Sequence, residues 1–339
     1  HKAYTMSSGG DTLDLTGTFD WSNADETGDV TTSGYVIDKD LILQGQSAST
    51  TFIQAASSAE TAGKKVFSVS GSYDLTIQDL NIRYGYPTTY TSGGCINVGG
   101  TATLTMNRSE VNNCKAYRGY GGGIYASGDT TITNSSIYSN GVYYDGAGIV
   151  ITSGADLIMT NSTVYNNIGP GYPSYNGGGI LVGANDNTTA TATITNCTIT
   201  GNYTPYGGGG IYVSGNAGLV LNLKNTIVAG NTSNNGGQYN NVFKETAATI
   251  TSNGYNIVGA SKYYTAATGD WTDQDNNGTY DLYSIGTTGS LNLDSSSANN
   301  DNTYGTLTYG IQSSSIAINN ANATANNGVS IPSTDQRGA

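Results

Sequence analysis

The sequence contains few of the residues on which acid–base catalysis and ion pairing depend. The only histidine is His1, so no histidine-based triad or relay is available. Charged residues make up 11% of the 339 residues, and 24 acidic residues against 12 basic ones give a net charge of −12. An acidic chain of this kind is a poor partner for nucleic acid and for anionic membranes.

Proline, cysteine and long apolar runs are also scarce. Five prolines beside 48 glycines exclude collagen and a proline-rich linker. No apolar run reaches the ~18 residues of a membrane-spanning helix, so we expect no transmembrane segment. Three cysteines, Cys95, Cys114 and Cys197, leave at least one thiol unpaired or paired with another chain. The sequence leaves open whether any two of them are bridged.

The chain is instead rich in Gly, Ser, Thr, Asn and Tyr. Most of these residues are weak helix formers, and no long segment has helical periodicity, so we expect an all-β protein. Hydrophobic residues account for 36% of the chain, enough for a sizeable core. Tyr accounts for 26 residues, against 2 Trp and 4 Phe, and its amphipathic ring suits exposed strands and stacking on sugars.

Three sequence markers recur about every 30 residues. One is a glycine run leading into Ile, the second is a Thr-rich alternating strand with an aliphatic residue, and the third is Ile or Val followed three residues later by Asn. The glycine runs lead into Ile96, Ile124, Ile149, Ile180 and Ile211; the aliphatic markers are Leu43, Ile77, Leu104, Ile132, Ile158, Ile194, Leu221 and Ile250; the third marker pairs are Ile137/Asn140, Val164/Asn167, Ile199/Asn202 and Val228/Asn231.

Three short strands per repeat predict a parallel β-helix (β-solenoid), in which inward side chains stack on those of the next coil. The segment between the Asn and the next glycine run varies in length, which is typical of insertion loops on one face of a solenoid. A propeller needs four strands per blade and ranks second, and a β-sandwich does not explain the repeats. We expect one continuous core that contains Leu43, Ile77, Leu104, Ile132, Ile194 and Leu221.

The clarity of the repeats divides the chain into three parts. Residues 62–232 hold the regular repeats. Residues 1–61 are expected to form an N-terminal cap and the first coils, and residues 233–339 the C-terminal coils and a cap with an acidic loop. Capping is expected because an open final coil exposes strand edges.

Three parts of the chain resemble the bacterial surface proteins called choice-of-anchor Q. They are residues 40–45 with 49–53, residues 225–231 followed by 254–259, and residues 314–318 with 334–338. The Gly-Gly-Gly-Ile steps also resemble the repeat of chlamydia-type polymorphic outer-membrane proteins. This resemblance covers most of the chain and implies a right-handed β-helix that is secreted or displayed on a cell surface. The start at His1 fits a processed chain, and the end at Ala339 gives no support to a covalent or sortase-type anchor.

One acidic segment carries candidate metal ligands. Oxygen donors at positions 1, 3, 5 and 9, with glycine at position 6, match the start of a calcium loop. Ser284 stands where a helix-loop-helix site has Glu, so the segment looks more like the calcium loops of dockerins and thrombospondin-type repeats. A solvated acidic turn is the alternative. The donors are Asp273, Asp275, Asn277 and Asp281, with the carbonyl of Thr279 at position 7.

Tyrosines recur in the variable loops of successive repeats. Because stacked coils lie ~4.8 Å apart, we expect these rings to form one aromatic binding surface for a glycan or a neighbouring protein chain. The alternative is that each ring packs over its own loop. The residues are Tyr117, Tyr120, Tyr143, Tyr144, Tyr172, Tyr175, Tyr203 and Tyr206.

Several Asn residues stand in Asn-x-Ser/Thr sequons. Asn134, Asn161 and Asn196 recur at one position of the repeat, which favours a role in turns. The better candidates for glycosylation are Asn187, Asn202 and Asn231.

These observations favour a non-enzymatic extracellular protein, structural or adhesive, that self-associates into a filament or sheath. Acidic residues of the regular repeats are isolated in sequence, as Asp129 and Asp145 are, and a β-helix ends in edges that accept a partner strand. The expected partners are other copies of the chain and glycans of a host or neighbouring cell surface. The alternative is a polysaccharide-binding or lyase-like, polysaccharide-degrading β-helix, with Lys115 and Arg118 as candidate basic residues.

Overall fold

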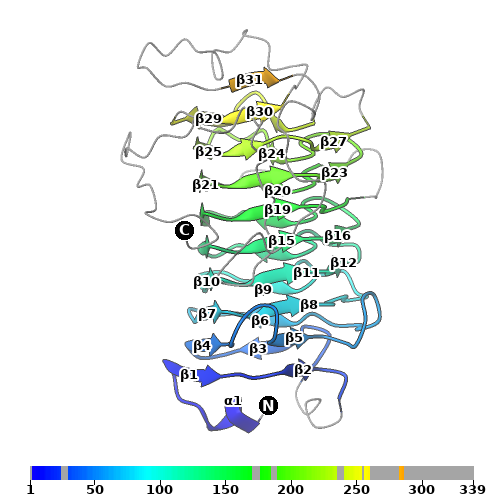
Figure 1. Ribbon diagram of the computed structural model, residues 1–339, viewed down its shortest axis with the longest axis vertical. Coiled ribbons are helices and arrows are strands. Elements are labelled where there is room, and N and C mark those ends of the chain that lie inside the picture. The colour runs from blue at the N-terminus through cyan, green and yellow to red at the C-terminus, as the bar shows by residue number, and fades with distance from the viewer. Residues whose placement is uncertain are drawn as a thin grey trace.

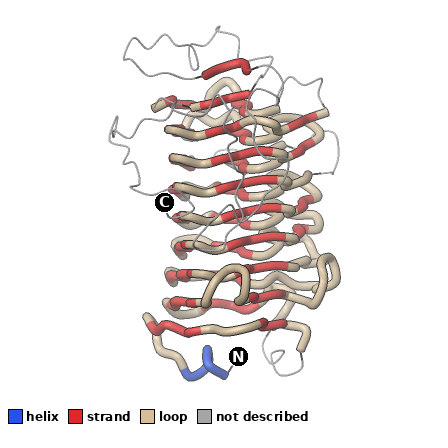
Figure 2. The backbone as a smooth tube through the Cα atoms, viewed as in Figure 1, coloured by secondary structure: helices blue, strands red, loops and turns tan. Residues whose placement is uncertain are grey.

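The structure is a computed structural model that describes residues 2–23, 30–169, 176–184, 189–234, 240–253 and 256–259, and the backbone of 282–285. The chain winds into a stack of coils, and each coil contributes one strand to each of three parallel sheets (Figure 1). Strands and connecting loops lie in register from one coil to the next (Figure 2). The predicted parallel β-solenoid with three strands per coil is confirmed.

The first sheet is built from the Thr-rich strands of the repeat. Alternating Thr and aliphatic residues suit a sheet with one face in the core. Its strands, in order along the stack, are β1 (Asp11–Asp14), β4 (Leu41–Gln44), β7 (Asp74–Gln78), β10 (Thr103–Asn107), β14 (Thr130–Thr133), β18 (Asp156–Thr160), β21 (Ala190–Thr195), β25 (Leu219–Lys224) and β29 (Thr249–Ser252).

The second sheet follows the first in each coil and contains the Ile or Val that precedes the recurrent Asn. Its strands are β2 (Thr18–Asp20), β5 (Phe52–Gln54), β8 (Asn81–Arg83), β11 (Glu110–Asn112), β15 (Ser136–Tyr138), β19 (Thr163–Tyr165), β22 (Thr198–Thr200), β26 (Ile227–Val228), β30 (Ile257–Gly259) and β31 (Leu282–Ile285).

The third sheet begins at the glycine runs. Its strands are β3 (Tyr35–Ile37), β6 (Phe67–Val69), β9 (Ile96–Val98), β13 (Ile124–Ala126), β17 (Ile149–Ile151), β20 (Ile180–Val182), β24 (Ile211–Val213) and β28 (Val242–Lys244). Strands on both sides of residues 61 and 232 pair in the same sheets, β4 with β7 and β25 with β29. The domain boundaries at these residues stay predictions.

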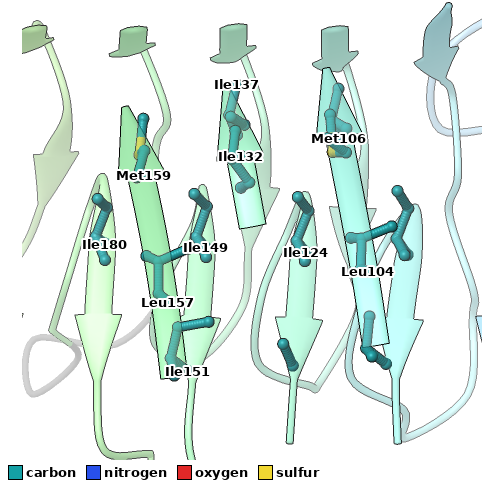
Figure 3. Packing of buried hydrophobic residues seen from close by; sticks show 14 of the residues in the cluster. Leu104, Met106, Ile124, Ile132, Ile137, Ile149, Ile151, Leu157, Met159 and Ile180 are labelled. Atoms are coloured by element: carbon teal, nitrogen blue, oxygen red, sulfur yellow. The ribbon is translucent and has the colours of Figure 1, made fainter. Parts of the chain in front are cut away.

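The core is a column of aliphatic side chains inside the coils (Figure 3). All six residues predicted to share it are at most 5% exposed and belong to one cluster. The first sheet directs two rows inward: Ile77 pairs with Met106, and Leu104 pairs with Leu75. Leu104 and Leu221 therefore lie in a different row from Leu43, Ile77, Ile132 and Ile194, two residues away along each strand.

The aliphatic marker at Ile158 is one residue out of register with the inward rows of the sheet. Ile158 pairs with Thr131 and Thr193 on the outer face and is 49% exposed. Its neighbours Leu157 and Met159 point inward instead and are fully buried. The strand contains three aliphatic residues in succession, so residue type alone did not reveal which one faces out.

A ladder of hydroxyl groups lines the corner between the first and second sheets. The backbone N–H groups of Leu80, Ser109 and Ser135 donate to the hydroxyls of Ser109, Ser135 and Ser162, at 3.2, 3.1 and 3.1 Å. Cys197 takes the next position, and its N–H donates to the Thr226 hydroxyl at 3.4 Å. Burial raises the pKa of the Cys197 thiol to about 12, so it is a structural and unreactive group.

The N-terminal end of the stack is partly covered by the short helix α1 (Lys2–Met6), drawn at the end opposite β31 in Figure 1. The Tyr4 hydroxyl donates to the Asp38 carboxylate at 2.5 Å, and the Lys39 ammonium donates to the carbonyl of Tyr4 at 3.1 Å. Among the described residues, no helix is long and apolar enough to cross a membrane.

Candidate binding cleft at the corner between the second and third sheets

The described residues of the variable segments lie at the corner that leads from the second sheet to the third. Two short parallel pairs form there: β12 (Lys115–Ala116) with β16 (Gly141–Val142), and β23 (Tyr203–Thr204) with β27 (Thr232–Ser233). Bridges link Gly141 to Ile168 and Ile168 to Tyr203. The corner is therefore a narrow extra sheet whose residues are in register over several coils.

Side chains alternate across this narrow sheet. Ala116 and Val142 are buried against Ala147, which places the residues on either side of them on the outer face. Three outer rows result, spaced two residues apart along the chain: Asn113, Ser139 and Asn166; then Lys115, Gly141 and Ile168; then Tyr117 and Tyr143.

The first two of these rows line a cleft of about 480 Å³ together with Ala59 and Glu60. This volume falls within the range of ~300–1,000 Å³ that is usual for small-ligand sites. The middle of the cleft is open because Gly141 has no side chain between Lys115 and Ile168. A Cβ atom at Gly141 would lie 3.5 Å from Cγ of Lys115, an ordinary contact, so a larger residue fills the cleft without forcing the backbone.

One row of the cleft owes its shape to an unusual backbone conformation. Asn113, Ser139 and Asn166 have φ of 51°, 52° and 52°, the left-handed region that Asn tolerates better than most residues. Each directly precedes a buried corner residue: Cys114, Asn140 or Asn167. The sharp turn presents amide and hydroxyl groups along the cleft, each able to bind a ligand hydroxyl.

The charges of the cleft compensate each other. The Lys115 ammonium lies 2.9 Å from the Glu60 carboxylate, and both side chains are partly exposed. An exposed pair of this kind contributes less than ~1 kcal/mol to stability. Glu60 reaches the cleft from a loop far away in sequence, and the Lys115 ammonium also lies 5.8 Å from the centre of the Tyr86 ring.

Aromatic rings border the cleft. Ring centres of Tyr86 and Tyr117 are 6.3 Å apart, and those of Tyr117 and Tyr143 are 6.1 Å apart. Tyr120 and Tyr144 are 5.8 Å apart, and Tyr144 also contacts Tyr143 at 5.4 Å. The repeat pattern thus led correctly to a continuous group of rings at Tyr117, Tyr120, Tyr143 and Tyr144. Their role in binding stays a prediction.

The remaining tyrosines of the predicted surface are not shown to lie in the row of Tyr117 and Tyr143. Tyr203 shares the row of Gly141 and Ile168 rather than that of Tyr117, so it lies two residues out of the predicted alignment. Tyr206 is 41% exposed. Tyr172 and Tyr175 lie outside the described residues.

Two of the three glycan positions do not fit the structure. Asn202 and Asn231 are at most 2% exposed and belong to a buried ladder of side-chain amides. The Nδ2 group of Asn202 donates to the Val164 carbonyl at 3.0 Å and to Oδ1 of Asn231 at 2.9 Å. Both of its hydrogens are used inside the protein, which leaves no room for a glycan on this nitrogen in the folded state. Asn187 lies outside the described residues and stays a prediction.

The turn interpretation of the other recurrent asparagines is confirmed. Asn134, Asn161 and Asn196 have φ of 50°, 48° and 54° at the corner after the first sheet. Side chains of this row contact one another, and Nδ2 of Asn161 donates to Oδ1 of Asn134 at 3.4 Å.

The predicted calcium ligands Asp273, Asp275, Asn277, Thr279 and Asp281 all lie outside the described residues. The part of the chain that the structure describes contains no group of three or more His, Cys, Asp or Glu residues able to hold a metal ion. Calcium at the acidic loop therefore stays a prediction from the sequence.

The structure pairs two of the three cysteines. Cys95 and Cys114 form a disulfide with their Cα atoms 5.4 Å apart, and Cys197 is free and buried. Cys114 is also one of the residues that line the cleft, so the bridge fixes one side of it.

Comparison with known protein families supports the same architecture. The family model for the right-handed β-helix region matches residues 65–260. Because this match covers more than half of the chain, the protein belongs to the right-handed β-helix family. No curated protein and no solved structure matches the chain.

Proposed function

We propose that the protein is a non-enzymatic extracellular β-helix that adheres to carbohydrate through the cleft at Gly141. The observation that carries this proposal is the arrangement of the corner: a row of amide and hydroxyl groups lines the cleft, the space at Gly141 is open, and a row of tyrosine rings adjoins the cleft beyond Lys115. Sugars present both hydroxyl groups and apolar C–H faces, which is the chemistry that such a pair of rows complements.

The geometry of the rows suits a chain-like ligand. Equivalent residues of adjacent coils lie ~4.8 Å apart, which is close to the length of one sugar unit along an extended glycan. A glycan lying along the solenoid axis meets both a polar group and a ring in two successive coils, those of Asn113 with Tyr117 and of Ser139 with Tyr143. Asn113, Ser139 and Asn166 provide the polar contacts, and Tyr86, Tyr117 and Tyr143 the rings.

Two observations favour an extracellular location. A disulfide such as Cys95–Cys114 persists mainly in oxidising compartments. The resemblance to choice-of-anchor Q and polymorphic outer-membrane proteins points to secreted or surface-displayed chains with adhesive or structural roles.

The enzymatic alternative centres on the same cleft. A polysaccharide lyase needs a basic group that removes a proton beside a carboxylate. Lys115 is the basic residue of the cleft, but its ammonium is paired with Glu60 at 2.9 Å. Release of unsaturated sugar from any polysaccharide, abolished in Lys115→Ala, would replace the adhesive proposal by a lyase.

The adhesive proposal is tested by glycan binding to matched variants. An array identifies bound glycans, and calorimetry then compares wild type with Gly141→Val and Tyr117→Ala. We expect Gly141→Val to abolish binding by filling the cleft, and Tyr117→Ala to weaken it about tenfold through the loss of one stacked ring. The controls are Gly99→Val, at a glycine just after β9 where an added Cβ makes only ordinary contacts, and Tyr73→Ala, at an exposed ring outside the cleft.

Retained binding in Gly141→Val, with the fold intact by circular dichroism, would show that the cleft is not the site. Binding lost equally in the Gly99→Val and Tyr73→Ala controls would show that the effect is not local to the cleft.

A second proposal is self-association through the N-terminal end. Leu13, Leu15 and Phe19 are only partly buried beneath α1, and Met6 is 76% exposed. An incompletely covered end of a coil stack is a surface on which a second copy can pack. Analytical ultracentrifugation should show concentration-dependent assembly that Met6→Asp reduces. A monomer at all concentrations would leave a monomeric adhesin.

A further inference from the structure

Arg118 lies beside the cleft on the loop that follows β12. Its Cζ atom is 5.4 Å from the centre of the Tyr117 ring and 5.2 Å from that of Tyr90. One guanidinium nitrogen also donates to the Tyr90 hydroxyl at 3.2 Å. Arg118 is exposed, and Tyr90 is 69% exposed. The two rings hold the guanidinium in one place while leaving most of its donors open to solvent.

Other arginines of the described chain use their guanidinium groups inside the protein. Arg108 makes two hydrogen bonds to the carboxylate of Asp79, at 2.7 and 2.6 Å. Arg83 donates to Gln54 at 2.8 Å and stacks over Phe52. Within residues 30–169, which the structure describes without a gap, no carboxylate pairs with Arg118. The donors of its planar fork that do not bind Tyr90 are therefore free for a ligand.

The charge of the surroundings gives this arginine a specific use. The protein has a net charge of −12, and the charges of the neighbouring cleft cancel in the Glu60–Lys115 pair. A ligand that bears carboxylates is repelled by the protein as a whole and needs a local cation to bind. Arg118 provides it, since a guanidinium binds a carboxylate through two parallel hydrogen bonds.

We propose that Arg118, held between Tyr90 and Tyr117, binds the carboxylate of an acidic sugar and makes the cleft selective for carboxylated glycans. This inference rests on the proposed carbohydrate binding and names its ligand class. Tyr117 joins the two parts of the site, because it contacts both Arg118 and the ring of Tyr143. The carboxylate belongs either to an internal uronic acid or to a terminal sialic acid.

The experiment compares pairs of ligands that differ in the acidic group. Calorimetry measures wild-type binding of tetragalacturonate against its methyl ester, and of sialyllactose against lactose. We expect the acidic member of one pair to bind at least about tenfold more tightly, the contribution of a charge-assisted pair of hydrogen bonds. Which pair shows the preference identifies the source of the carboxylate.

Variants then assign the preference to Arg118. Arg118→Ala should remove the preference and leave the neutral ligand bound as before, while Arg118→Lys should keep part of it, because an ammonium retains the charge but not the fork. Tyr73→Ala, at an exposed ring outside the cleft, is the control. The preference should also weaken with added salt.

The outcomes separate the two proposals. Equal binding of acidic and neutral ligands by wild type, or a loss of both in Arg118→Ala, would overturn the role of Arg118 and leave the carbohydrate cleft standing. A sulfated oligosaccharide bound as tightly as the carboxylated one would overturn the carboxylate selectivity. Absence of any glycan binding would overturn the cleft itself.

Discussion

Cys95 and Cys114 form a disulfide at the position of their coil that Gly123 and Asn140 occupy in the next coil, where the glycine packs against the amide. Strand register aligns Cys95 with Gly123 and Cys114 with Asn140. A Cβ atom at Gly123 would lie 2.7 Å from the carbonyl oxygen of Gly148 and 3.0 Å from Nδ2 of Asn140, so only glycine fits there without a shift of the backbone or the amide. The bridge therefore replaces a glycine–asparagine contact, and the backbone N–H of Cys114 still donates to Oδ1 of Asn140 at 3.1 Å.

The first prediction concerns this replacement. Changing both cysteines to Ala should lower the free energy of unfolding by about 3 kcal/mol, the usual effect of a bridge that closes a loop of this size. Cys95→Gly combined with Cys114→Asn should recover part of the loss, because the new amide extends the ladder. Chemical denaturation measures both variants. A double variant less stable than the alanine pair would contradict the equivalence of the two sites.

The asparagine ladder itself gives the second prediction. Oδ1 of Asn167 accepts from the backbone N–H and from Nδ2 of Asn140, at 3.1 and 2.9 Å, in a fully buried environment. Asn167→Ala leaves both donors without their acceptor and should cost about 2–4 kcal/mol of unfolding free energy. The control is the adjacent exposed residue, Asn166→Gly, whose φ of 52° glycine adopts freely. Equal losses of unfolding free energy in the two variants would show that the ladder does not stabilise the fold.

The third prediction uses the register of the first sheet. Ile132→Ala removes a fully buried side chain and should cost about 2–5 kcal/mol, whereas Ile158→Ala, on the outer face, should change stability by less than about 1 kcal/mol. Thermal or chemical unfolding of the two variants compares the same substitution on opposite faces of adjacent strands. A large loss of unfolding free energy in Ile158→Ala would show that this side chain is buried in the core, contrary to the strand register.

Calcium supplies the fourth prediction. If the acidic loop binds Ca²⁺ through Asp273 and Asp275, calcium at a hundred times its dissociation constant should stabilise the fold by about 2.7 kcal/mol. The melting temperature should fall in chelator and recover when calcium is restored. Asp273→Asn with Asp275→Asn should abolish the response. A wild-type melting temperature that ignores chelator would leave the acidic segment as a solvated turn.

The sequence was informative wherever a pattern repeats and much less so where it does not. Strand order, the corner with variable loops and the burial of Ile77 and Ile132 all followed from alternation and period. The strand at Ile158 could not be placed, because three successive aliphatic residues hide the alternation. Ser139 and Asn166 could have been found, since each precedes an asparagine of the corner ladder. Glu60 could not, because it joins the cleft from a loop in an earlier coil.

The last prediction concerns pH. Burial raises the pKa of the Asp145 carboxyl to about 6, although the backbone N–H of Asn176 donates to it at 2.5 Å and acts in the opposite direction. Because the folded-state pKa is raised, the favourable contribution of this group is complete below its ordinary pKa of 3.8 and is lost as the pH rises through about 6.

Asp145→Asn keeps an acceptor for the N–H and removes the buried charge. The free energy of unfolding of Asp145→Asn relative to wild type should be about 2 kcal/mol higher at pH 8 than at pH 4. Asp129→Asn is the control, since this exposed carboxylate also accepts a backbone N–H, from Asp156 at 2.9 Å, without a buried charge to relieve. Denaturation of both variants at pH 4 and pH 8 decides the matter: a difference at Asp145 that does not change between the two pH values would show that the carboxyl carries no cost of burial.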